Sequence, residues 1–408
     1  MWSPEACGAK GGVLHCARQT KFPRAPMKIL ILTVLGDIHA AAVAWGLRVL
    51  GHTPVTWFWT EFLRSDGCSL CLNDSGQIEH SFSTGTSHDV VPPFDSIWYR
   101  RRGRVAPRSS SHPADMAFIT REAEAYLQNS LALVGDDNTL WINHPVASRH
   151  ADNKLVQLIA AREVGFQVPE TLMTNDFSRV RAFYEKNKGN VIFKTFRPAS
   201  WRCQDGSITH VCTTPIHAEH LLDEEAIRAC PGIYQPKLDK LYELRVTVVG
   251  GNVLAAAIDS QIARPSMDWR YDFPSATLPL KATTLPNEVS ERCVALCRKL
   301  NIVYGAIDIV VSREGDYVFL EINESGQFLW VEQLDPALHV LDAVCRSIAF
   351  KSVPKFQTAE PVLLEDFMTS AAYVEWQQEC AYLTSLNRPD PICKPERQAT
   401  IGIMHIRT

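Results

Sequence analysis

The hydrophobic and polar positions of the chain form two kinds of pattern, and their order predicts the fold. Short apolar runs typical of buried strands occur at residues 28–33 and 55–59, whereas residues 40–50 have the spacing of a helix that Gly51 would end. A strand, a helix and a second strand in this order predict a parallel α/β domain, which we expect to extend to about residue 142.

A second region begins after this domain and has a different pattern. Residues 153–164 have helical spacing, and Asp152 would cap the start of this helix. Farther along, residues 191–194 form a short apolar strand, and residues 244–258 predict a hairpin with two glycines at its turn.

The most informative chemical pattern lies in an apolar hairpin at residues 307–323. If Ser312 pairs with Tyr317 across a four-residue turn, Asp308 lies directly opposite Glu321. Carboxylates on facing strands repel each other, so a cation is expected between them. The alternative is a half-buried hairpin with its acids in water, but acids rarely enter such apolar strands unpaired.

The amide of Asn323 would point to the same face as Glu321, because strand side chains alternate. Two carboxylates and an amide oxygen then converge on one patch. Hard oxygen ligands of this kind suit Mg²⁺ that is shared with the phosphates of a nucleotide. We therefore predict that Asp308, Glu321 and Asn323 bind the metal.

Three consecutive arginines end another predicted strand, at residues 96–102. Ligands of open α/β sheets bind at the carboxyl ends of the strands, although a solvated strand end explains the pattern equally well. We predict that Arg100 or Arg101 holds the carboxylates of an acidic substrate. Because the two side chains would alternate across the strand, only one of them should matter strongly.

Composition and charge exclude several classes of function. The 408-residue chain has a net charge of −4 and a pI near 6.4, which gives no basis for binding nucleic acid or an anionic membrane. No apolar run reaches the ~18 residues needed to span a bilayer, and residues 1–26 lack the apolar core of a secretory signal. The expected location is the cytoplasm.

Twelve cysteines are scattered along the chain, and most are expected to be free thiols in a reducing compartment. Cys68 and Cys71 have the spacing of a redox or zinc motif. No second pair and no neighbouring histidine completes a tetrahedral site, so we expect both to be dispensable.

Several segments between about residues 27 and 350 together resemble the ATP-grasp superfamily, most closely the microviridin-type peptide ligases, also called graspetide synthetases. The absence of a Walker-type or dinucleotide glycine motif fits this resemblance. The matching segments include Trp98-Tyr-Arg-Arg, Asp152-Asn-Lys-Leu-Val-Gln-Leu, Val191-Ile-Phe-Lys, Tyr242-Glu-Leu-Arg-Val-Thr-Val-Val-Gly, Asp268-Trp-Arg and Phe319-Leu-Glu-Ile-Asn-Glu-Ser-Gly-Gln-Phe-Leu-Trp330.

The resemblance implies a fold of the α/β and α+β classes, namely an ATP-grasp fold with an N-terminal parallel α/β domain. It implies an N-terminal domain at 27–142, a central ATP-grasp lobe at 143–233 and a C-terminal ATP-grasp lobe at 234–350. The resemblance leaves both ends unexplained: residues 1–26 are predicted to be a flexible extension, and residues 351–408 an extension of unknown role.

The resemblance also assigns the nucleotide contacts. Lys154 and Lys194 would contact the phosphates of ATP, for which a solvent-exposed role is the alternative. The adenine hinge would lie at Gln235, Lys237 and Leu238, although a proline follows the glutamine where an acidic residue is common. Because proline lacks an N–H group, the remaining hinge residues would supply the hydrogen bonds.

Three further charged residues complete the implied site. Glu243 would contact the nucleotide, and Arg245 and Arg270 would act as catalytic cations near the γ-phosphate. For Glu243 and Arg245, which share one strand face, a salt-bridge ladder on the surface is the alternative. The implied cofactors are ATP and Mg²⁺, with Mn²⁺ as a substitute.

The implied activity is that of an ADP-forming carboxylate–amine or carboxylate–hydroxyl ligase that works through an acyl phosphate. The substrate would be a ribosomal precursor peptide with a leader, and side-chain esters or amides would close its rings. An amino-acid or glutathione-type small-molecule ligase is the first alternative, and a nonenzymatic ATP-binding module is the second. Related enzymes are often homodimers, a point that this sequence leaves open.

Overall fold

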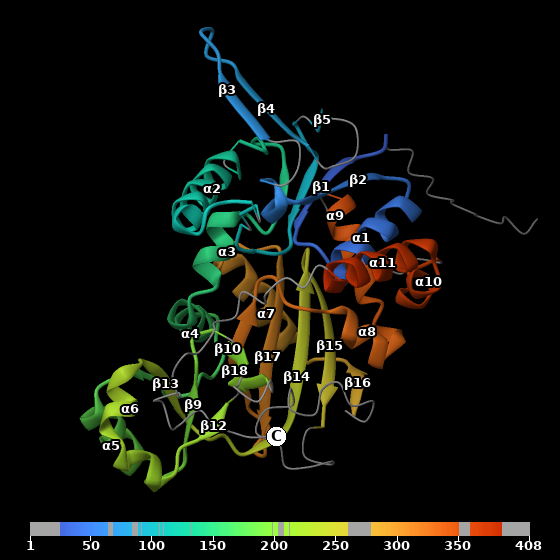
Figure 1. The fold of residues 1–408 in the computed structure, drawn as a ribbon. Helices are drawn as coiled ribbons and strands as arrows, with labels where there is room; N and C mark the ends of the chain where they lie inside the picture. The colour runs from blue at the N-terminus through green and yellow to red at the C-terminus, as the bar shows by residue number, and fades with distance from the viewer. Residues whose placement is uncertain are drawn as a thin grey trace, which may run out of the picture.

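The structure is a computed structural model, and it describes residues 25–385 except 64–67, 84–88, 91, 106, 109, 132, 198, 203–207, 212, 260–278 and 351–359. It places three main sheets along the molecule, with helices on their faces (Figure 1). Among the described residues, no helix combines the length and the apolar character that crossing a membrane would require.

The N-terminal sheet is parallel, as predicted. Its strand order is β2-β1-β6-β7, and α1 follows the first strand. The bounds are β1 (Lys28–Thr33), α1 (Ile38–Val49), β2 (Thr53–Phe58), β6 (Ser96–Tyr99), α2 (Met116–Leu131) and β7 (Leu140–Ile142). Strand β6 ends at Tyr99, so the three arginines lie just beyond its carboxyl end rather than within the strand.

An antiparallel sheet that the sequence did not predict projects from this domain at the top of Figure 1. It consists of β3 (Cys68–Leu72), β4 (Ile78–Ser83) and β5 (Asp89–Val90).

The second sheet is antiparallel, has the order β12-β9-β13-β8, and packs against two helices. Its elements are β8 (Leu172–Thr174), α5 (Phe177–Lys186), β9 (Val191–Lys194), β12 (Thr214–Pro215), α6 (Glu224–Ala229) and β13 (Gly232–Pro236). A separate hairpin is formed by β10 (Ala199–Arg202) and β11 (Ile208–Val211).

The third sheet is antiparallel, has the order β16-β15-β14-β17-β18, and buries its core against α4 and α7. Its strands and helices are α3 (Pro145–Ala151), α4 (Lys154–Glu163), β14 (Lys240–Val249), β15 (Asn252–Ile258), β16 (Leu280–Thr283), α7 (Asn287–Lys299), β17 (Tyr304–Ser312) and β18 (Tyr317–Asn323). The predicted glycine turn between β14 and β15 is confirmed, with positive φ at Gly250 and Gly251.

The predicted cap of the central helix is wrong by one residue. The side chain of Asn153, not that of Asp152, accepts hydrogen bonds from the first free N–H groups of α4. Asp152 instead ends α3, and its carboxylate lies 3.1 Å from Arg102 Nη2.

Four C-terminal helices follow, which Figure 1 shows in orange and red; the last three lie beside α1, and the first packs against two of them and β16. They are α8 (Leu329–Leu334), α9 (Val340–Ala349), α10 (Leu364–Met368) and α11 (Ala371–Ser385). Their apolar side chains share one core with β1 and α1. From α11, Trp376 Nε1 donates to the carbonyl of Gly36 (3.0 Å) and Glu379 Oε1 accepts from its N–H group (2.6 Å).

Candidate active site

Three charged side chains lie abreast across the five-stranded sheet. Arg245 of β14 is opposite Asp308 of β17, and Asp308 is opposite Glu321 of β18. Directly opposite residues point to the same face of a sheet, so the three side chains share one surface. The predicted opposition of the two acids is confirmed.

The register that led to this prediction is wrong near the turn. Tyr317 pairs with Val311 rather than with Ser312. The N–H group of Ser312 instead donates to the carbonyl of Asp316 (3.0 Å), so the turn between them has three residues rather than four, with Gly315 at a φ of 89°. A β-bulge then leaves Leu320 unopposed and shifts the pairing by one residue. The bulge is therefore the feature that brings the two acids face to face.

Each of the two acids has a cation beside it. Arg245 Nη1 lies 2.7 Å from Asp308 Oδ1, and both side chains are almost fully buried. Lys154 Nζ, from the first turn of α4, lies 2.7 Å from Glu321 Oε2. Buried charges need such compensation, so α4 and β14 supply the cations that allow two acids within an apolar sheet.

The donor set fits a magnesium ion that completes its shell with phosphate oxygens. The Asn323 amide lies beside Glu321, with 3.5 Å between Nδ2 and Oε1, and Mg²⁺ is typically held by one or two carboxylates together with substrate phosphates. Within the described ranges, no group of three or more His, Cys, Asp or Glu side chains could hold a metal ion. The two carboxylates and the amide thus suit a shared ion rather than a closed metal cage.

The second predicted phosphate residue, Lys194, and the hinge glutamine lie on the neighbouring four-stranded sheet. Lys194 ends β9 and is paired with Ile233 of β13. The buried side chain of Gln235 donates from Nε2 to Thr171 Oγ1 (2.9 Å). This contact fixes the glutamine amide within the protein.

The last two hinge residues follow β13 directly and lead into β14. The N–H group of Lys237 donates to the carbonyl of Asn190 (2.9 Å), while its side chain is exposed. Leu238 is half-buried. The hydrogen bond of Lys237 anchors the connection between the two sheets.

The interpretation of Glu243 and Arg245 as a surface salt-bridge ladder is wrong. Both residues are buried, at 6% and 5% exposed, and they pair with different partners. Glu243 Oε1 lies 2.6 Å from Lys240 Nζ. The remaining predicted cation, Arg270, lies outside the described residues.

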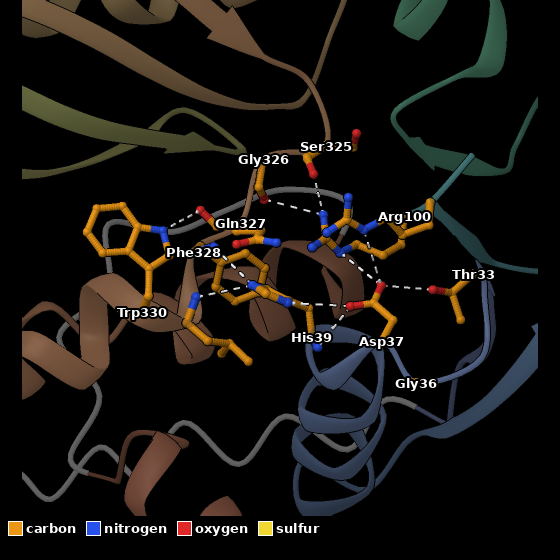
Figure 2. Close-up of polar contacts among 12 residues, drawn as sticks. Thr33, Gly36, Asp37, His39, Arg100, Ser325, Gly326, Gln327, Phe328 and Trp330 are labelled. Atoms are coloured by element: carbon orange, nitrogen blue, oxygen red, sulfur yellow. Dashed lines mark hydrogen bonds and ion pairs between the residues drawn. The ribbon is translucent and has the colours of Figure 1, made fainter. Parts of the chain in front are cut away.

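The two candidate substrate arginines have different surroundings. Arg100 is only 1% exposed, and its Nε lies 3.3 Å from Asp37 Oδ2. Its Nη1 donates to the carbonyls of Ser325 and Gly326 (Figure 2). The side chain of Arg101 is 36% exposed and lies farther from the same carboxylate, at 3.9 Å.

Sequence reasoning missed the acid that faces these arginines. Asp37 follows the carboxyl end of β1, at the same edge of the sheet as the arginines after β6. The argument that selected the arginines would therefore also have selected this aspartate. Its carboxylate accepts from Thr33 Oγ1 (2.9 Å) and lies 3.4 Å from His39 Nδ1.

The pKa values of Asp37 and His39 both lie below their ordinary values, for different physical reasons. Burial lowers the pKa of His39 to about 4, and the nearby Arg100 charge acts in the same direction. Burial alone would raise the pKa of Asp37, but hydrogen bonding to His39 and the charge of Arg100 hold it well below its usual range. Near neutral pH, a neutral imidazole therefore faces a carboxylate.

A second group of contacts that the sequence did not reveal connects the end of β7 to the two strands that carry Asp308 and Glu321. Asn143 Nδ2 donates to the carbonyls of Tyr304 (2.8 Å) and Glu324 (2.7 Å), and its Oδ1 accepts from the N–H groups of Val303 and Tyr304. The Glu324 carboxylate accepts from Arg102 and Ser148, each at 2.7 Å. These contacts connect segments far apart in the sequence, so no local pattern signals them.

Solved structures similar to this one cover most of the chain. A RiPP-associated ATP-grasp ligase of Chryseobacterium gregarium, in complex with ADP and a leader and core peptide, has a TM-score of 0.74 and 25% identity over 82% of this chain and 100% of that one. The macrocyclase MdnB of Microcystis aeruginosa has a TM-score of 0.65 and 25% identity, with 80% and 100% covered.

The macrocyclase MdnC of the same organism, bound with the precursor peptide MdnA, has a TM-score of 0.69 and 23% identity, with 79% and 99% covered. No protein-family model matches the sequence, and no curated protein is significantly similar to it. The resemblance inferred from the sequence is nonetheless confirmed by these structures: the chain has the ATP-grasp fold of peptide-modifying ligases and macrocyclases.

Proposed function

We propose that this protein is an ADP-forming ATP-grasp ligase that joins side chains of a ribosomal precursor peptide through esters or amides. The observation that carries the proposal is the row of Arg245, Asp308 and Glu321 across three strands, with Lys154 on its outer side. Alternating cations and carboxylates of this kind suit a metal-bound triphosphate. The similar solved structures with bound ADP and peptides support the same assignment.

The chemistry begins with the two reacting groups held together. A carboxylate oxygen of the peptide attacks the γ-phosphorus of ATP, the bond to the β-phosphate oxygen breaks, and ADP leaves. A hydroxyl or amine of the peptide then attacks the acyl carbon, and inorganic phosphate leaves with the electron pair of the broken bond. The proton of the attacking group passes to phosphate or water.

The residues of this chain would act mainly by position and charge. Asp308, Glu321 and Asn323 would hold Mg²⁺, which when bound neutralises charge on the phosphates. Lys154 and Arg245 would face the same phosphates after exchanging part of their carboxylate contacts for phosphate oxygens. Lys194, Glu243, Arg270 and the hinge residues keep the roles predicted from the sequence.

Arg101 is the better candidate of the two arginines for holding a substrate carboxylate. Its side chain is partly exposed, whereas Arg100 is buried against Asp37 and backbone carbonyls. An acidic side chain of the peptide could therefore reach Arg101, whose 3.9 Å ion pair with Asp37 is longer than that of Arg100. A homodimer and a cytoplasmic location stay predictions from the sequence.

The test is to incubate the protein with ATP, Mg²⁺ and short peptides encoded beside its gene, and to follow peptide mass. Each ring closure should remove one water, about 18 Da. Arg101→Gln should reduce this loss about tenfold or more, since a charge-assisted contact disappears. Arg104→Gln, an exposed position in the same segment, should not. Ligation of free amino acids with every peptide inert would establish the small-molecule ligase instead.

A further inference from the structure

The loop that follows the proposed metal strand lies directly against Arg245. We refer to residues 324–328 as the β18–α8 loop. The carbonyl of Gln327 accepts from Arg245 Nη2 (3.0 Å). A Cβ atom at Gly326 would lie 2.6 Å from the Ala306 Cβ and 3.0 Å from Arg245 Nη2, so only glycine allows this close approach. The position of the loop therefore determines where the Arg245 guanidinium can lie.

Two side chains of the N-terminal domain hold this loop from the other side (Figure 2). Arg100 Nη1 donates to the carbonyls of Ser325 and Gly326. His39 Nε2 accepts from the N–H groups of Phe328 (3.1 Å) and Leu329 (3.4 Å). Both carbonyl and N–H groups of the backbone are thus bound by side chains that lie more than two hundred residues away in the sequence.

The carboxylate of Asp37 contacts both of these side chains. Its Oδ2 lies 3.3 Å from Arg100 Nε, and its Oδ1 lies 3.4 Å from His39 Nδ1. The first contact compensates a fully buried guanidinium. The second favours the tautomer with hydrogen on Nδ1, which leaves the Nε2 lone pair free to accept from Phe328. All three side chains are at most 7% exposed, so water offers little competition.

We propose that Asp37 is a positioning residue for the ligase reaction: through Arg100 and His39 it fixes the β18–α8 loop, which in turn holds Arg245 at the reacting centre. This inference rests on the proposed function for the role of Arg245. The network itself is a property of the fold and can be tested without a substrate.

Three substitutions separate positioning from packing. Asp37→Asn keeps a good N-cap for α1, where the aspartate side chain now accepts from the N–H group of His39, but it removes the negative charge facing Arg100. His39→Phe keeps a ring against Phe328, where the rings now lie 4.9 Å apart, but it removes the acceptor. His39→Gln does the reverse, because it keeps an acceptor of similar reach and loses the ring.

The first measurement is hydrogen exchange of residues 324–330 in the full-length protein without ligands. We expect faster exchange in Asp37→Asn and His39→Phe than in the wild type, and near-normal exchange in His39→Gln. Unchanged exchange in the first two variants would overturn the proposal, and so would a greater effect of His39→Gln than of His39→Phe, which would show that ring packing holds the loop.

The second measurement is ATP-dependent loss of water from the peptide. We expect kcat to fall about tenfold or more in Asp37→Asn and His39→Phe, with the KM for ATP within about twofold of wild type, because catalytic geometry and not nucleotide affinity is lost. Altered exchange with normal kcat would overturn the role in catalysis. A wild-type protein inactive on every peptide, with the exchange pattern intact, would defeat the proposed function and leave the network standing.

Discussion

Asp308 is buried and Glu321 is half-buried, each beside a cation, and this determines what their substitution should do. In Glu321→Gln the amide cannot balance Lys154, which is 2.7 Å away, and one anionic ligand for Mg²⁺ is lost. We expect ATP turnover to fall by about a hundredfold or more while the circular dichroism spectrum is unchanged.

The matched control is Glu314→Gln, an exposed acid in the turn of the same hairpin. It removes the same charge without touching the row of paired residues, so turnover should be normal. Normal turnover of Glu321→Gln at saturating Mg²⁺ would contradict the metal assignment.

His39 should make stability depend on pH. Its pKa is lowered from 6.5 to about 4 in the folded protein, so between these values the unfolded chain binds more protons than the native state. The stabilisation is complete above pH ~6.5 and is lost as the pH falls toward 4, by roughly 3 kcal/mol in total.

Asp37, whose pKa is also lowered, acts in the same direction only at still lower pH, since its ordinary value is 3.8. The measurement is urea unfolding at pH 7, 6 and 5, for which His39→Gln should show a smaller loss of stability than the wild type. Equal pH dependence in the two proteins would show that the imidazole titrates normally.

At the scale of elements, the sequence predicted the apolar strands well and their exact pairing less well. The hydrophobic pattern located β1, β9, β14 and β17 because apolar residues dominate each of them. It could not show the bulge at Leu320, because an extra residue in one strand of a pair leaves no mark on the hydrophobic pattern. The opposition of Asp308 and Glu321 was correctly predicted even though the assumed turn was wrong.

The residues of the candidate site were likewise only partly predictable from the sequence. Charged residues within strands were visible in the sequence as exceptions to an apolar pattern, as Arg245 and Asp308 illustrate. Asp37 and Asn143 were not, because polar residues at the ends of strands are ordinary and only the tertiary structure shows what they contact.

The geometry of β3 rules out a metal ion shared by its two cysteines. Cys68 and Cys71 are three residues apart on an extended strand, paired with Phe82 and Glu79 respectively, so their side chains point to opposite faces. They cannot hold one ion together. We expect Cys71→Ser to bind no less zinc than the wild type and to keep full activity, as measured by metal analysis of the purified proteins. Stoichiometric zinc that disappears in this variant would contradict the geometry.

At the scale of the whole molecule, the main surprise is the place of the segment beyond residue 350. It was expected to be an extension of unknown role, yet Val362, Leu364 and Phe367 belong to the same core as β1 and α1. A short amphipathic helix carries no information about a partner three hundred residues earlier, so periodicity alone could not reveal this packing.

Phe367→Ala should therefore destabilise the N-terminal domain. The ring is fully buried, and replacing such a residue by alanine typically costs about 3–5 kcal/mol. Met368→Ala, at a neighbouring side chain that is 37% exposed, should cost about 1 kcal/mol or less. Urea unfolding followed by tryptophan fluorescence measures both, and equal effects would contradict the assigned core.

The hydrogen bonds between Gly36 and α11 link residues 340 and 343 positions apart, and this separation has a consequence for biosynthesis. At ~5–20 residues per second, Glu379 leaves the ribosome about 20–70 s after Gly36. During that interval the apolar face of α1 has no C-terminal helices to cover it, and the loop before Asp37 lacks its support. This part of the nascent protein must stay unassembled until Glu379 has been made, so newly made chains should depend on chaperones that shield α1.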